Sequence, residues 1–201
     1  MPNWCENCLT IIGDSKKIAK LLRSICNEEG EIDFEKIIPS PKTIEECPER
    51  YIVKEEEKVS ISREPDRPWF NWYEWQCNNW GTKWNADYSS DSLLNKAKEL
   101  EEHNYDGCDD GVDIFFSTAW SPAIPIAEKL IEDNKDLNIE LKYFEWGMWY
   151  GGIVDEYGNR DCEDDTEIKD LAVEVFGYEY SDFEEDEEDE EEEDEFADDE
   201  F

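Results

Sequence analysis

The sequence predicts an α+β protein in which helices pack on one face of a mainly antiparallel sheet. Segments with alternating apolar residues, typical of strands, are interspersed with segments that repeat apolar residues at helical spacing. Aromatic residues make up 13% of the 201-residue chain, and such large rings let a modest number of side chains build a core. Acidic residues dominate the end of the chain. We therefore expect one domain over residues 1–181 and a disordered acidic tail over residues 182–201.

The first half of the domain begins with a strand and a helix. Residues 3–13 have strand character, and residues 14–30 carry an apolar stripe at helical spacing that Asp14 or Ser15 can cap. Charged and proline-rich residues follow, so we expect an insertion at about residues 40–80. Within the insertion, residues 69–79 are apolar on several sides, which is typical of a helix sandwiched between layers.

The second half contains the remaining elements. Residues 111–120 form the clearest strand, because apolar residues alternate through "GVDIFFSTAW". Residues 91–104 fit either a charged helix or an extended loop. The other expected elements are strands at 82–88 and 138–146, a hairpin at 147–159, and helices at 121–136 and 165–178.

The order of these elements predicts a topology. It runs strand, helix, insertion, strand, strand, helix, strand and hairpin. Two strand–helix–strand halves around an antiparallel sheet describe a ferredoxin-like sandwich, with helices on one face and the other face partly open. The term names a topology only, and we expect neither an iron–sulfur cluster nor another cofactor.

The chain is strongly acidic. Its 57 acidic and 19 basic residues give a formal net charge of −38. A field of this sign repels phosphate backbones and favours basic partners, although a local patch can still bind nucleic acid. We find no signal peptide and no apolar run that could span a membrane, and the seven cysteines are best explained as reduced thiols. We therefore predict a cytoplasmic protein with no membrane partner.

Two features that could support catalysis or metal binding have simpler explanations. Cys5 and Cys8 have a CxxC spacing, but they lie in a predicted strand, where residues three apart face opposite sides. His103 is the only histidine, and no nucleophile motif accompanies it. We therefore predict no catalytic residue, no metal site and no enzymatic activity.

The nine tryptophans have two competing interpretations. Trp84 and Trp120 are in phase with the apolar residues of their strands, so we predict that both are core residues, while Trp4 and Trp80 clamp the insertion helix onto the sheet. The alternative is a groove on the open face in which rings stack on bases or another ligand. The groove candidates are Lys83, Asn85, Lys142, Trp146 and Trp149.

Five blocks of the sequence resemble the signature blocks of a known family. In chain order over residues 1–157 they are "MPNWCENCLTIIG", "FEKIIPSP", "WYEWQCNNWGTKWNA", "FFSTAWSPAIPIAEKL" and "LKYFEWGMWYGGI". They look like those of the YubB-type ferredoxin-like family of phage and plasmid proteins. The resemblance implies the ferredoxin-like fold, a mobile-element origin and a location in the cytoplasm of a host cell. It implies no catalytic residue.

The tail resembles a second known pattern. Residues 182–201 contain 16 acids and no base, and they end in "FADDEF". This ending is similar to the acidic, phenylalanine-ended tips of single-stranded-DNA-binding proteins, although it lacks the proline that precedes the last residue of the bacterial tips. The resemblance implies that the ring fills an apolar pocket of a basic partner. The docking residues would be Phe196, Asp198, Asp199, Glu200 and Phe201; the alternative is a solvating tail.

Three functions are compatible with these observations. The first is a non-catalytic phage or plasmid accessory protein that binds a basic host or phage protein through its acidic surface and tail, as an inhibitor or DNA mimic. The second is a binder of single-stranded nucleic acid or a nucleotide through the tryptophan-rich groove. The third is an enzyme, for which the sequence offers no catalytic constellation. We expect the first.

Overall fold

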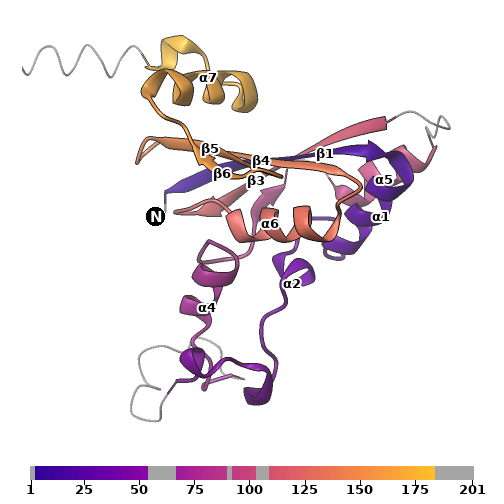
Figure 1. Cartoon of the computed structure of the whole chain (residues 1–201), viewed down its shortest axis with the longest axis vertical. Coiled ribbons are helices and arrows are strands. Elements are labelled where there is room, and N and C mark those ends of the chain that lie inside the picture. Colours follow the sequence, from indigo (N-terminus) through magenta and orange to yellow (C-terminus); the bar gives the residue numbers. More distant parts are fainter. Residues whose placement is uncertain (1–2, 54–66, 90–91, 103–108, 184–201) are drawn as a thin grey trace, which may run out of the picture.

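The computed structural model describes residues 3–53, 67–89, 92–102 and 109–183 (Figure 1). These residues form an open antiparallel sheet with helices, so the predicted α+β class is confirmed. Helices and strands interleave along the chain, as the alternating sequence patterns indicated.

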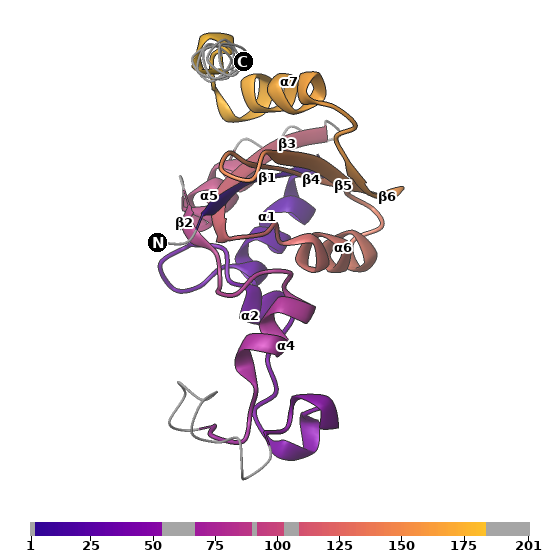
Figure 2. The same cartoon turned by 90° about the vertical axis from the view of Figure 1, so that its left-hand side faces the viewer.

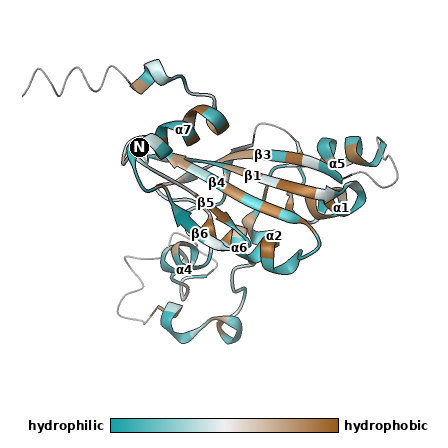
Figure 3. Ribbon diagram, turned by 45° about the horizontal axis from the view of Figure 1, so that its top comes forward, coloured by the Kyte–Doolittle hydropathy of each residue, from teal (hydrophilic) through white to brown (hydrophobic). Residues whose placement is uncertain are grey.

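The sheet has six strands, which are β1 (Trp4–Asp14), β2 (Asp87–Ser89), β3 (Asp109–Ala119), β4 (Asn138–Glu145), β5 (Tyr150–Asp155) and β6 (Gly158–Asp161). Neighbouring strands are all antiparallel, and their order is β2-β3-β1-β4-β5-β6. The central strands β1 and β3 are in register along their whole length. Along β1 and β4, hydrophobic residues are interspersed with hydrophilic ones, so each strand has a more apolar face (Figure 3).

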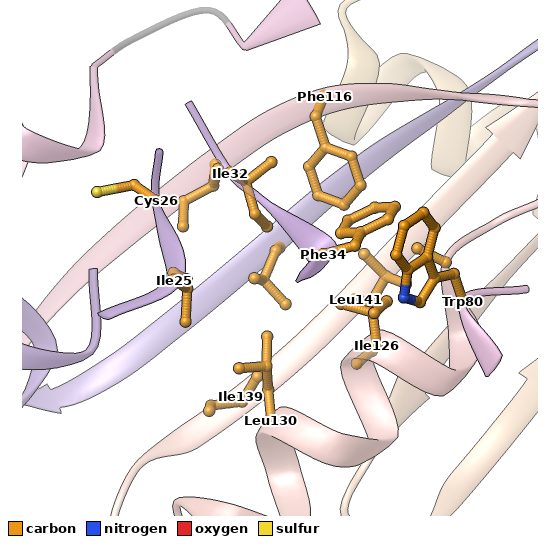
Figure 4. Close-up of a cluster of buried hydrophobic side chains, with 14 of the residues drawn as sticks. Ile25, Cys26, Ile32, Phe34, Trp80, Phe116, Ile126, Leu130, Ile139 and Leu141 are labelled. Carbon is orange, nitrogen blue, oxygen red and sulfur yellow. The ribbon is translucent and has the colours of Figure 1, made fainter. Parts of the chain in front are cut away.

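One face of the sheet carries the main hydrophobic core. The helices α1 (Ser15–Ile25) and α6 (Ile124–Asp133) pack on this face, and α5 (Leu93–Glu102) packs against α1. Figure 4 places Ile126 and Leu130 of α6 among core side chains that include Leu141 of β4 and Phe116 of β3. Burial of these apolar residues is the main force that holds the two layers together.

Helix α1 begins where the sequence predicts and ends earlier. The carboxylate of Asp14 accepts hydrogen bonds from two backbone N–H groups of the first turn, so Asp14 is the N-cap of the two predicted candidates and Ser15 is the first helical residue. The helix ends at Ile25 rather than at Gly30, because Cys26 is extended and forms an isolated β-bridge with Ile32.

A helix also covers part of the opposite face, so the prediction that helices lie on one face is wrong. The helix α7 (Asp165–Phe176) lies on the other side of the sheet from α1 and α6 (Figures 1 and 2). Its buried residues form a second, smaller cluster with Phe144 and Phe183. The physical reason is that alternation places Phe144 and Phe115 on this second face, where Phe176 of α7 contacts both rings.

The insertion forms a lobe that projects from the side of α1 and α6 (Figures 1 and 2). Its helix α4 (Trp72–Asn79) begins later than predicted, because Asn71 acts as the N-cap and accepts the backbone N–H of Glu74. The other elements of this part of the chain are α2 (Phe34–Ile37), η1 (Ile44–Glu46) and η2 (Glu49–Tyr51).

Trp80 joins this lobe to the core, as predicted, and two other tryptophan predictions are wrong. The Trp80 indole is 2% exposed and donates its N–H to the Ile38 carbonyl at 2.9 Å. Trp84 and Trp120, predicted to be core residues, are 36% and 44% exposed. Trp4, expected to clamp the insertion helix, is also exposed and lies at the start of β1.

The predictions that Trp84 and Trp120 are buried fail for the same reason. The predicted strand at residues 82–88 overlaps β2 (Asp87–Ser89) only at its last two residues, so Trp84 lies in irregular chain where strand alternation does not apply. Strand β3 ends at Ala119, and Trp120 adopts a left-handed backbone with φ of 71°. Both residues therefore lie just outside the strands whose alternation the prediction used.

The start of the predicted tail has a defined structure. Asp182 and Phe183 belong to the 3-10 helix η4 (Tyr180–Phe183), and Phe183 is buried. The prediction that disorder begins at residue 182 is therefore wrong for these two residues. The predicted disorder of residues 184–201 concerns a segment outside the described residues.

Candidate functional site

The structure divides the five predicted groove residues between two sides of the sheet. Asn85 lies on the side of α1 and the lobe, where it has a structural role. Its side-chain oxygen accepts the backbone N–H of Phe34 at 2.9 Å, and its amide donates to Asp33 at 2.7 Å. Asn85 therefore fixes the start of α2. Lys83 lies nearby in the same irregular segment, with its ammonium facing the Tyr73 ring of α4.

The other three groove residues lie on the side of α7. Lys142 of β4 forms an ion pair with Glu140 at 2.9 Å. Trp146 and Trp149, on the turn between β4 and β5, contact the buried Phe144 of the smaller cluster. A single groove that contains all five residues is therefore not formed.

A different set of large apolar side chains gathers at one end of the sheet. The start of β1, the end of β3 and the turn after β4 meet there, because Trp4 lies opposite Ala119 and the Trp120 N–H donates to the Asn3 carbonyl at 3.0 Å. We call this set the sheet-end surface. Its four exposed members are Trp4, Trp120, Trp146 and Met148.

Hydrogen bonds from neighbouring strands hold the backbone around Trp120 in an unfavourable conformation. Its φ of 71° lies in the left-handed region, which bulky residues rarely adopt. The Thr118 hydroxyl donates to the Ser121 carbonyl at 2.7 Å and accepts the side-chain N–H of Asn7 at 2.9 Å. The Tyr150 hydroxyl donates to the Trp120 carbonyl at 2.9 Å. Backbone strain that the surroundings maintain is typical of functional sites, so the exposed Trp120 ring is a candidate binding residue.

A buried carboxylate fixes the turn between β4 and β5. Glu145 accepts the backbone N–H groups of Gly147 at 2.9 Å and Met148 at 2.5 Å. A Cβ atom at Gly147 would lie 2.6 Å from the Asn3 amide, so any other residue there would displace the Asn3 side chain. The turn is therefore built to a single shape, which leaves the Met148 side chain exposed.

The C-terminal segment packs against the sheet-end surface. The Phe183 ring stacks on Trp146 with centroids 5.1 Å apart, and Tyr178 stacks on the same indole at 5.4 Å. Trp149 contacts Phe183 nearly perpendicularly at 5.5 Å. The acidic residues from Glu184 onward follow Phe183 directly in the sequence. The chain therefore enters its acidic segment beside the exposed rings.

One carboxylate lies under this C-terminal segment. The Tyr178 hydroxyl donates to Oε2 of Glu6 at 2.8 Å. Burial raises the pKa of Glu6 above its ordinary value, although the hydrogen bond from Tyr178 acts in the opposite direction. Burial and the Glu6 carboxylate raise the pKa of Tyr178, so its hydroxyl remains a donor. This contact links α7 and η4 to the central strand β1.

A second exposed aromatic surface lies on the lobe. The Lys83 ammonium is 4.4 Å from the centroid of the Trp84 ring and 5.9 Å from that of Tyr73. Both rings are exposed. We call Tyr73, Lys83 and Trp84 the lobe-side surface, which combines two stacking rings with a cation.

The described cysteines are poorly suited to nucleophilic chemistry. Burial raises the pKa of Cys5 to about 12 and that of Cys8 to about 11, so both thiols stay protonated at neutral pH. Across the residues that the structure describes, no group of three or more His, Cys, Asp or Glu side chains is placed to hold a metal ion. His103 lies outside those residues.

Some functional candidates were missed from the sequence and others stay untested. The sequence analysis did not identify Trp4, Trp120 and Met148 as exposed surface residues. Their positions at strand ends and in a turn could have indicated exposure, because the alternation of buried and exposed residues stops there. The five predicted tail-docking residues lie outside the described residues, so their role stays a prediction. They are Phe196, Asp198, Asp199, Glu200 and Phe201.

Comparison with known proteins yields no relative: no family model, no curated protein and no solved structure matches the chain. None of the described helices is long and apolar enough to cross a membrane. Function must therefore be inferred from the exposed surfaces themselves.

Proposed function

We propose that this protein is a non-catalytic accessory protein of a phage or plasmid that binds a basic host or phage protein. The contact combines the sheet-end surface with the acidic segment that follows Phe183. The observation that supports this most directly is the stacking of Phe183 on Trp146, because it brings dense negative charge next to exposed rings.

Charge and rings supply different parts of the binding. The 16 acids of residues 182–201 attract a basic surface over long range and speed the encounter. Charge alone gives binding that salt screens and that selects weakly among basic partners. Exposed tryptophans and methionine are residue types that protein interfaces use as anchors, so the sheet-end surface supplies the selectivity.

The absence of catalysis is part of this proposal. The raised pKa values of Cys5 and Cys8 support it, because protonated thiols are weak nucleophiles. The buried Glu145 and the half-buried Glu6 also have structural partners: Glu145 holds the β4–β5 turn, and Glu6 accepts the Tyr178 hydroxyl.

We also propose that the core is a ferredoxin-like domain of the YubB-type family, working in the cytoplasm of a host cell. The strand order β2-β3-β1-β4 supports this topology. In the first half, β1 and β2 are connected through α1, and β3 lies between them in the sheet. In the second half, β3 and β4 are connected through α6, and β1 lies between them. Each half is therefore a split β-α-β unit. Strands β5 and β6 and helix α7 would be additions. The unpaired cysteines of the described residues support a reducing compartment.

The test first captures a binding partner and then measures how its affinity changes when the Trp120 ring is removed. Proteins from a host-cell lysate are captured on the immobilised full-length chain, purified singly and titrated against it. We expect a basic protein whose affinity falls by about tenfold or more on Trp120→Ala, because buried tryptophans are common hot spots. Trp84→Ala on the lobe is the control. A captured protein that is acidic, or that binds Trp120→Ala as tightly as the parent, contradicts the proposal.

One observation favours a second candidate function, the binding of a nucleotide or of single-stranded nucleic acid. The lobe-side surface holds a cation between two exposed rings, on which a base could stack while Lys83 meets a phosphate. Nucleotides and mixed oligonucleotides should then quench tryptophan fluorescence, and Lys83→Glu should abolish the effect. Absence of quenching at millimolar nucleotide would remove this candidate.

A further inference from the structure

We propose that a cavity beside Trp146 binds the guanidinium group of an arginine side chain on the basic partner. The inference rests on the proposed function and specifies the chemistry that the site recognises. The cavity has a volume of about 520 Å³, and its described lining residues are Trp146, Tyr178, Ser181 and Asp182. It lies where the chain enters its acidic segment, so an attracted basic surface arrives at this point.

The Trp146 indole provides a rigid wall for this cavity. Phe183 and Tyr178 stack on it with interplanar angles of 22° and 30°, which fixes the plane of the ring. The side chain nevertheless remains 37% exposed. Tryptophan is the best aromatic partner for a cation, and a guanidinium adds planar stacking that an ammonium cannot provide.

Asp182 provides a carboxylate at the same cavity. Its Oδ2 atom accepts the backbone N–H of Glu179 at 2.8 Å, which holds the side chain in place. Within the described part of the chain, its Oδ1 atom accepts no hydrogen bond and is available to a guanidinium N–H. Hydrogen bonds between two charged groups are roughly twice as strong as neutral ones, so this acid adds to the stacking.

The surrounding charge favours a cationic occupant. No Lys or Arg is among the described residues that line the cavity. Over residues 161–201 the sequence has a single basic residue, Lys169, among many acids. An arginine would therefore complement both the flat ring and the negative field, whereas a phosphate or an acidic peptide would be repelled.

The experiment compares hexa-arginine with hexa-lysine, titrated separately into the full-length protein at physiological salt. Both peptides carry the same charge and feel the same acidic segment, so their difference reports the cavity. We expect hexa-arginine to bind about threefold tighter or more, from the cation–π and stacking contributions. The ratio of the affinity for hexa-arginine to that for hexa-lysine should fall toward one in Trp146→Phe and in Asp182→Asn.

The two variants are conservative for different reasons. Phenylalanine at position 146 still offers a ring to Phe183, and asparagine at position 182 can still accept the Glu179 N–H. Trp84→Phe is the matched control, because Trp84 is exposed to a similar degree, 36%, on the other aromatic surface. It should leave the preference unchanged.

The outcomes separate this inference from the proposed function. Equal affinity of the two peptides for the parent protein, or a preference that survives in both cavity variants, overturns the guanidinium site even if a basic partner is captured. Failure of both peptides to bind overturns the site too, and together with failure to capture any basic partner it removes the proposed function as well.

Discussion

The sheet-end surface and the lobe-side surface both expose tryptophan, but different charges accompany the rings. The first is built on strand ends and a turn, with Trp120 in a strained conformation and an acidic segment alongside. The second is built on α4 and irregular chain, and it carries its own cation between two rings. From this difference we expect the exposed rings to define where a partner binds and the neighbouring charges to define which partner binds.

The largest expected effect concerns stability and separates buried from exposed tryptophan on the lobe. Trp80→Ala should lower the free energy of unfolding by about 3–5 kcal/mol, because it opens a cavity beside Phe34 and Trp75. Trp84→Ala should lower it by about 1 kcal/mol or less, since its ring is already exposed. Urea unfolding of both variants measures this contrast. Equal losses would mean that the lobe-side surface is part of the core rather than a surface.

The next effect tests charge at the two surfaces. Replacing the acids of residues 184–195 by their amides should weaken hexa-lysine binding by about a hundredfold at low salt, because steering by charge is lost. The same change should leave nucleotide quenching at Trp84 unchanged or strengthen it, since repulsion of phosphate falls. Isothermal titration and fluorescence give the two readouts. If the change weakened both hexa-lysine binding and nucleotide quenching, the two surfaces would not be independent.

A smaller effect is expected from the last residue. Deleting Phe201 leaves every acidic side chain in place and removes one apolar anchor. Burying a phenylalanine ring contributes about 1.5–3 kcal/mol, so affinity for the captured partner should fall about tenfold or more. Thermal unfolding of the domain should not change. Undiminished affinity would show that the segment contributes charge alone.

The smallest effect is a pH dependence at the contact between Glu6 and Tyr178. Because burial raises the pKa of Glu6 in the folded state, its contribution to stability is fully present below the unfolded pKa and is lost as pH rises through the folded value. Glu6→Gln, which can still accept the Tyr178 hydroxyl, should therefore be slightly more stable than the parent at neutral pH. The advantage should disappear below about pH 4, near the ordinary pKa of glutamate. Thermal melts across pH 3–8 test the sign, and an advantage that grows on acidification would contradict it.

The regular parts of the fold were predictable because they follow simple periodicities. The strand around Ile114 alternates cleanly, and the stripe of α1 with its Asp14 cap defines a helix without tertiary information. The antiparallel sheet and the presence of an insertion followed from the order of these elements, whereas the projection of the insertion as a lobe did not.

The remaining features depend on contacts that no local pattern reveals. Trp84 and Trp120 lie just beyond their strands, where alternation no longer predicts burial. The position of α7 depends on Phe144 and Phe115, which need a cover on the second face. The predicted groove failed because Lys83 and Lys142 lie on opposite sides of the sheet, a relation that only the assembled layers define.

The burial of Phe183 makes it the fixed end of a tether. Whatever conformation residues 184–201 adopt, covalent geometry keeps Phe201 within about 60 Å of that ring. A partner that binds Phe201 as proposed would therefore be confined to a limited volume around the sheet-end surface. Its second contact would then form at a raised effective concentration. If both proposed contacts form, two contacts that are each weak would hold a partner longer than either does alone.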